Sequence, residues 1–148
     1  MTRSCLGFAL AGLLLAACSE SLTVEQQIIA TLRNMEVAAE AGEHFDFMAH
    51  VAEDFQGQLG DMDRQAFHRF MIFQINQHRR LRAQFFPIYV TDLGNGQATA
   101  KFQLLVTGGA GLLPDSGQLY DVQTRWTRDS SDWMLTGAEW EPVRMPEG

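Results

Sequence analysis

The spacing of apolar residues changes once along this chain of 148 residues, close to Arg82. Before this point, apolar side chains recur every three or four residues, as at Ile28, Leu32 and Met35, which is typical of one face of a helix. Beyond it, residues 98–104 alternate between apolar and polar side chains, which is typical of a strand with one buried face. Helices that precede a run of strands predict an α+β domain.

The first two helices are predicted from caps and spacing. Thr23 and Gln26 have the spacing of a capping box, in which each side chain accepts from the other residue's backbone N–H, so a helix should begin here. Gly42 is a typical helix end. A second, short helix is expected over residues 45–52, and its spacing would turn four apolar side chains inward: Phe45, Met48, Val51 and Phe55.

A third helix and four strands complete the predicted fold. Asp61 or Asp63 can cap the helix, which should end near His78 and carry one largely apolar face: Phe67, Phe70, Met71, Gln74 and Ile75. Pro87 lacks an N–H donor, so its strand should lie at a sheet edge or contain a bulge. We expect three helices followed by an antiparallel sheet of four or more strands, including 85–90, 97–107, 120–127 and 133–140.

The charge of the chain argues against a nucleic-acid-binding function. The chain has 11 Lys and Arg against 18 Asp and Glu, a net charge of -7, so it lacks the cations that neutralise nucleic-acid phosphates.

Histidine spacing gives no sign of a metal site. His44 and His50 are six positions apart, and His68 and His78 are ten apart, whereas two ligands on one helical face lie three or four apart. The chain also lacks an HExxH motif. We therefore predict neither a metal site nor a cofactor.

Residues 1–17 have the pattern of a secretory signal, with a charge at Arg3 and an apolar run over 5–17. A helix needs about 20 apolar residues to cross a bilayer, so this run is too short to span. It ends in Leu15-Ala16-Ala17-Cys18, which resembles the lipobox of bacterial lipoproteins. The resemblance implies cleavage after Ala17, a diacylglycerol on the Cys18 thiol, and a fatty acyl chain such as palmitate on the new amino terminus. Cys5 would leave with the signal, so the mature chain would have no free thiol for a disulfide, for catalysis or for a metal.

This resemblance predicts a protein of the bacterial cell envelope. Two or more acyl chains hold a protein stably at a membrane, whereas one chain does so only marginally. In lipoproteins of enteric bacteria, an Asp directly after the cysteine favours retention at the inner membrane, and this chain has Ser19 there. The resemblance therefore predicts anchoring in the outer membrane, facing the periplasm. The predicted parts are a signal peptide, a lipidated tether, one folded domain and a loose tail: 1–17, 18–22, 23–141 and 142–148.

Within the domain, three features resemble the nuclear transport factor 2-like superfamily. They are the capped first helix ending in Glu40-Ala41-Gly42, the acidic Glu53-Asp54-Phe55, and the strand pair over 120–126 and 133–140. The resemblance implies a curved sheet that wraps a long helix into a cone, with a ligand pocket at the open end. Polar residues on otherwise apolar faces are the candidates to line it: Tyr89, Tyr120, His50, His68, Asp121 and Arg125.

The same superfamily includes ketosteroid isomerases and polyketide cyclases that use a carboxylate as a base. In the isomerases the base lies a few residues beyond the segment that here reads Glu53-Asp54-Phe55, and this chain has neutral residues there: Gln56, Gly57, Gln58 and Leu59. We therefore assign no catalytic residue. A domain that binds a small apolar ligand or a partner protein without catalysis is the leading hypothesis, and an isomerase, dehydratase or cyclase is the alternative.

Two surface features suggest partners. Arg79, Arg80 and Arg82 form a basic cluster, which either neutralises the end of the third helix or contacts an anionic lipid headgroup or another envelope protein. The loop 108–117 contains Leu112-Leu113 and would suit a structural subunit of an envelope complex. The superfamily resemblance also makes a homodimer formed through the sheet compatible with this sequence.

Overall fold

The structure is a computed structural model that describes residues 20–77, 80–108 and 116–144. Within these residues, two helices come first, strands β1 and β2 flank a short 3₁₀ helix, η1, and a third helix precedes four consecutive strands. The helices are α1 (Val24–Ala41), α2 (His44–Met48), η1 (Gln58–Gly60) and α3 (Arg64–Gln77). The strands are β1 (Val51–Gly57), β2 (Met62–Asp63), β3 (Arg82–Gly94), β4 (Gln97–Gly108), β5 (Ser116–Asp129) and β6 (Asp132–Pro142).

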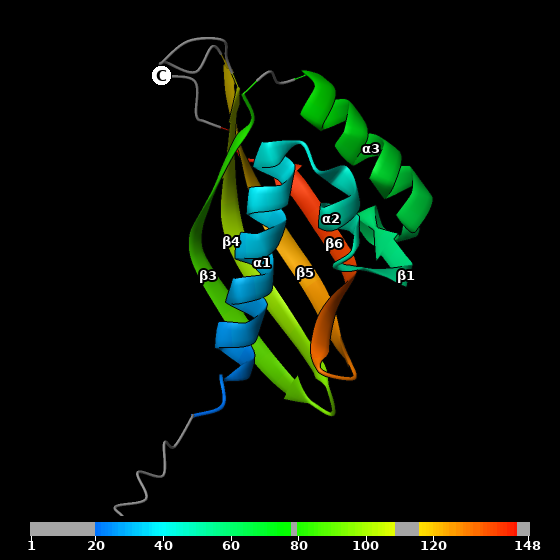
Figure 1. The fold of residues 1–148 in the computed structure, drawn as a ribbon. Coiled ribbons are helices and arrows are strands. Elements are labelled where there is room, and N and C mark those ends of the chain that lie inside the picture. The colour runs from blue at the N-terminus through cyan, green and yellow to red at the C-terminus, as the bar shows by residue number, and fades with distance from the viewer. Residues whose placement is uncertain (1–19, 78–79, 109–115, 145–148) are drawn as a thin grey trace, which may run out of the picture.

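The strands form one sheet in the order β2-β1-β6-β5-β4-β3. The neighbours pair antiparallel except β1 and β6, which pair in parallel. The long strands curve around α1, and α2 and α3 lie on the same side as α1, toward β1 (Figure 1). An α+β fold with a curved, mostly antiparallel sheet is thus confirmed, with six strands in the sheet.

The predicted capping box of α1 is confirmed. The Gln26 N–H donates to the Thr23 hydroxyl at 3.2 Å, and the Thr23 N–H donates to the Gln26 side-chain oxygen at 2.9 Å. Gly42 ends the helix in the left-handed conformation, at φ 79°. The apolar side of α1 is buried against the sheet: Ile28, Leu32, Met35, Ala38 and Ala39.

The predicted second helix is wrong beyond Met48, because Val51–Gly57 forms strand β1. Val51 and Phe55 are four positions apart, and this spacing places two side chains on one side of a helix and also on one face of a strand. Three residues of this segment pair with β6, at Val51, Gln56 and Gly57, with a register shift between the first two. Phe55 is buried as expected, with 1% exposure, but Phe45 is 73% exposed rather than inward-facing.

Pro87 behaves as predicted. Its strand, β3, lies at the edge of the sheet, and the pairing of β3 with β4 shifts register between Phe86 and Tyr89. The shift reverses the alternation, so Phe85 packs against the core before the bulge and Val90 does so after it. Phe86 and Tyr89 are exposed as a result.

Several predicted segments lie outside the described residues. These are the signal peptide and Cys18, most of the loop over 108–117, Arg79, and the end of the tail. In the part of the chain that is described, no helix combines the length and the apolar character that a membrane-crossing helix requires.

Candidate functional site

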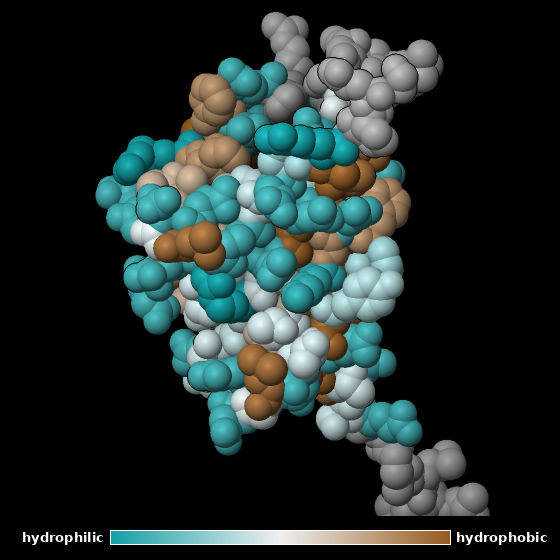
Figure 2. Space-filling model, turned by 180° about the vertical axis from the view of Figure 1, so that it is seen from behind, coloured by the Kyte–Doolittle hydropathy of each residue, from teal (hydrophilic) through white to brown (hydrophobic). Residues whose placement is uncertain are grey.

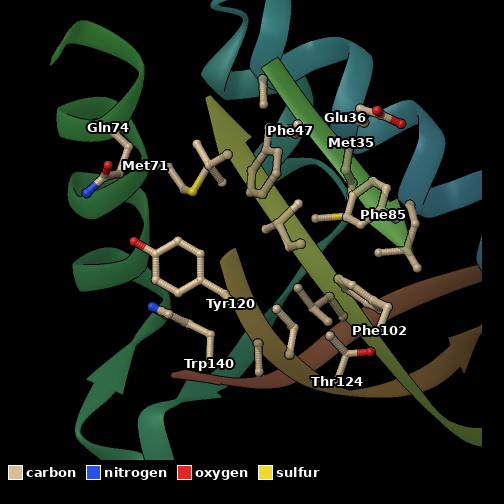
Figure 3. Close-up of a pocket in the computed structure, with 18 of the residues that line it drawn as sticks. Met35, Glu36, Phe47, Met71, Gln74, Phe85, Phe102, Tyr120, Thr124 and Trp140 are labelled. Atoms are coloured by element: carbon tan, nitrogen blue, oxygen red, sulfur yellow. The ribbon is translucent and has the colours of Figure 1, made fainter. Parts of the chain in front are cut away.

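A cavity of about 180 Å³ lies between the sheet and helices α1 and α3 (Figure 3). Most of its lining is apolar. The predicted face of α3 contributes Phe67, Phe70, Met71 and Gln74, which confirms that face. The strands contribute alternate residues from their inner face, among them Phe102, Leu104, Val106, Tyr120, Val122, Thr124, Leu135, Ala138 and Trp140.

The polar groups of the lining gather mainly at one side. The Tyr120 hydroxyl and the Trp140 indole nitrogen both point toward α3, the helix that carries Gln74 (Figure 3). The Thr124 hydroxyl is already occupied, since it donates to the Ala100 carbonyl at 3.0 Å and accepts from the Trp126 indole at 2.8 Å. The cavity therefore offers an amide, a phenol and an indole N–H on the side of α3, all of them neutral.

Among the described residues, Glu36 is the one carboxylate in the lining of this cavity. It belongs to α1 and lies across the cavity from Gln74 (Figure 3). Arg33, one turn earlier on α1, donates to this carboxylate at 2.9 Å. The carboxylate is therefore already hydrogen-bonded within α1.

Gln58 occupies the region where an isomerase would carry its base, and it has a structural role here. Its side-chain nitrogen donates to the Trp140 carbonyl, and its side-chain oxygen accepts from the Trp140 N–H, both at 3.1 Å. The amide thus pairs with β6 as a strand backbone would and holds Trp140 in the cavity wall. The next residue, Leu59, is 88% exposed.

Of the six candidate pocket residues, only Tyr120 lines this cavity. Asp121 and Arg125 also lie on β5 but face outward, because neighbouring residues of a strand point to opposite faces. The Asp121 carboxylate accepts from Gln103 at 3.0 Å, and Arg125 donates to both oxygens of Glu139 at 2.7 Å. Tyr89 is 67% exposed beyond the bulge of β3.

The remaining two candidates are histidines outside this cavity. His50 lines a separate groove formed by α1 and the β5–β6 hairpin. Partial burial lowers the pKa of its imidazole, and the charges of Asp132 and Asp46 oppose that shift. His68 lies on α3, where its Nε2 is 2.8 Å from Nδ1 of His44. Partial burial, His44 and the Arg64 charge all lower the pKa of His68.

The basic cluster is divided between elements. Arg82 lies at the start of β3 rather than at a helix end, and its guanidinium donates to Glu40 of α1 at 3.3 Å. The other Glu40 oxygen accepts from the Ala83 N–H at 2.9 Å. Arg80 is exposed between α3 and β3. A partner for these cations remains a prediction.

The outer face of the sheet is largely hydrophilic, with isolated apolar residues (Figure 2). Lys101, Gln103 and Gln123 are exposed there on β4 and β5. Stable homodimer interfaces bury an apolar centre, and these side chains supply little of one. A homodimer through the sheet stays a prediction.

No family model matches the chain, and no curated protein matches it significantly. Solved structures, in contrast, match this chain in fold. A candidate dehydratase of the NTF2-like family from Streptomyces avermitilis is 16% identical, with a TM-score of 0.69 over 81% of this chain and 96% of that one. An NTF2-like protein of unknown function from Pseudomonas putida is 15% identical, with a TM-score of 0.68 over 82% and 89%.

A longer protein, Bd1075 of Bdellovibrio bacteriovorus, is also similar, at 10% identity and a TM-score of 0.69 over 80% of this chain. The chain spans 41% of the length of Bd1075. Identities this low carry no residue-by-residue assignment of function, but the agreement with the first two structures over 81% and 82% of this chain defines the architecture. The chain therefore has the α+β nuclear transport factor 2-like fold, with a six-stranded curved sheet.

Proposed function

We propose that this domain binds a small apolar ligand in the cavity without catalysis, as a lipid-anchored protein of the bacterial cell envelope. The observation that supports binding is the lining, in which apolar side chains surround neutral polar groups on one side. Apolar ligands gain about 25 cal/mol for each Å² of surface removed from water. The anchor rests on the lipobox that ends at Cys18.

The cavity sets the size of the ligand. Its volume is about 180 Å³, and an engineered apolar cavity of about 150 Å³ is large enough to bind benzene. A single ring or a short acyl chain therefore fits without rearrangement of the walls. Larger ligands would need α3 or the side chains of Phe70 and Met71 to move.

The polar side indicates what the ligand carries. A hydroxyl or carbonyl group placed beside α3 could hydrogen-bond to Gln74, Tyr120 or Trp140. A charged group would lose its hydration without gaining a counter-charge, because Glu36 is already paired with Arg33. A neutral ligand with one polar group is thus favoured over an ion.

Filling the cavity should abolish binding. Ala138 is buried on β6 and lines the cavity, so Ala138→Leu adds volume inside it. With benzyl alcohol, a neutral single-ring probe with one hydroxyl, we expect saturable binding to the wild type and affinity at least about tenfold weaker in Ala138→Leu, equivalent to about 1.4 kcal/mol. Titration followed by nuclear magnetic resonance measures both affinities.

Ala41→Leu is the matched control, because Ala41 is exposed at the end of α1. It should leave probe affinity unchanged. Overpacking typically costs about 1–3 kcal/mol of stability, so urea unfolding must show that Ala138→Leu is folded at the temperature of the titration. Wild-type affinity in a folded Ala138→Leu protein would show that the probe binds elsewhere.

Catalysis by an isomerase, dehydratase or cyclase is the second candidate. The similarity to a candidate dehydratase and the presence of Glu36 in the lining favour it. A base that forms an enolate removes a hydrogen from the carbon next to a carbonyl, and in D₂O a deuterium replaces it. With cyclohexanone in D₂O, we expect deuterium uptake, followed by mass spectrometry, no faster than in buffer. Exchange that is faster with the wild type than with Glu36→Gln would favour the enzyme instead.

A further inference from the structure

Two imidazoles meet on the surface, outside the lining of the cavity. His44 begins α2 and His68 lies on α3, and their Nδ1 and Nε2 atoms are 2.8 Å apart. The exposed Phe45 ring packs against both, with ring centres 4.2 Å from His44 and 5.5 Å from His68. Both histidines are half-buried. The fold therefore brings together two nitrogen donors from different helices.

The separation of the rings suits two ligands of one ion. Metal–imidazole bonds of about 2.0–2.1 Å place two bound rings with their centres roughly 4.5–5.3 Å apart, for angles at the metal between about 90° and 109°. The centres of the His44 and His68 rings are 5.0 Å apart. Histidine χ2 has a broad rotamer distribution, so the rings can turn both lone pairs toward an ion while the backbone stays in place.

The surrounding charge selects the kind of ion. Imidazole binds metals in its neutral form. Arg64 lies one turn before His68 on α3, so its positive charge opposes a cation at the pair. Its guanidinium donates to the carbonyls of Met48 and Val51. Only an ion with strong affinity for imidazole would bind, and among divalent first-row ions Cu²⁺ has the highest.

We propose that His44 and His68 together bind a divalent transition-metal ion, with Cu²⁺ bound most tightly. Among the residues that the structure describes, no third His, Cys, Asp or Glu joins them in a cluster, so water would complete the coordination. The spacing of histidines along the sequence missed this pair because its members lie 24 positions apart, on separate helices. The proposal is independent of ligand binding in the cavity.

Copper titration of the full chain, prepared without a histidine tag, tests the site. Electron paramagnetic resonance should show one saturable Cu²⁺ site with splitting from two imidazole nitrogens. His44→Gln and His68→Gln should each remove that signal and weaken binding by about tenfold or more. Glutamine is a poor copper ligand but can still hydrogen-bond to the remaining imidazole, so each variant should keep its melting temperature.

His50→Gln is the matched control, because His50 lies in the separate groove beside α1. It should bind Cu²⁺ as the wild type does. Absence of a saturable two-nitrogen site in the wild type would overturn the proposal and leave the pair as a hydrogen bond only. Wild-type affinity and splitting in His44→Gln or His68→Gln, or equal loss in His50→Gln, would overturn it as well.

Discussion

Phe55→Ala should be among the most destabilising single substitutions in this domain, with a loss of about 3–5 kcal/mol in the free energy of unfolding. The Phe55 side chain is almost fully buried, and its ring stacks on that of Phe67 with centres 4.6 Å apart. Removing it leaves a cavity between β1 and α3 that the surrounding strands cannot close. Urea unfolding followed by circular dichroism measures the loss.

Phe45→Ala is the matched control, because the spacing of apolar residues predicts both phenylalanines to face inward from one helix. In the structure Phe45 is exposed and contacts His44 and His68 at the surface. Its removal should change stability by no more than about 1 kcal/mol. Comparable losses in Phe45→Ala and Phe55→Ala would contradict the placement of β1 and support the helix instead.

The parts of the fold that sequence reasoning predicted are those with strong local signals. The capping box at Thr23 and the glycine at Gly42 define α1 within its own sequence. Asp63 caps α3, where its carboxylate accepts from the Ala66 N–H at 2.7 Å. Pro87 marks an edge strand because its missing donor excludes it from a central one. Each of these signals acts over a few residues.

The strand β1 was missed because its partner is distant. Val51 pairs with Leu135 of β6, and nothing within residues 51–57 distinguishes this strand from the end of a helix. The two hydrogen bonds between the Gln58 side chain and the Trp140 backbone join residues 82 positions apart. Contacts of this kind become visible only once the strand order is known.

Sequence reasoning predicted only part of the candidate site, because the rest also depends on how distant segments are arranged. Gln74 lies on the predicted apolar face of α3 and lines the cavity. A polar residue on an otherwise apolar face was the sequence feature that indicated the polar side of the cavity. Tyr120 and Asp121 are adjacent on one strand, so their side chains point to opposite faces of the sheet and only one of them can face the cavity. Tyr89 faces outward because the bulge at Pro87 reverses the alternation of β3.

Cys18→Ser should abolish lipid attachment completely, because only the thiol can accept the diacylglycerol that the lipobox implies. Without that group, cleavage after Ala17 should fail, and the chain should keep residues 1–17. In a bacterial host grown with labelled palmitate, the wild type should incorporate label and Cys18→Ser should not. Mass spectrometry should find acyl mass on a wild-type chain that begins at Cys18, and an unacylated precursor in the variant.

Cys5→Ser is the matched control for the anchor, because Cys5 is the other cysteine of the chain and lies inside the apolar leader. It should be labelled, cleaved and retained at the membrane as the wild type is. Retention depends on the acyl chains, since each buried CH₂ contributes about 0.8 kcal/mol and two or more chains are needed for stable anchoring. A wild-type chain cleaved before Cys18 without acyl mass would show that the leader is an ordinary secretory signal. Palmitate label in Cys18→Ser would show that lipid is attached at another residue.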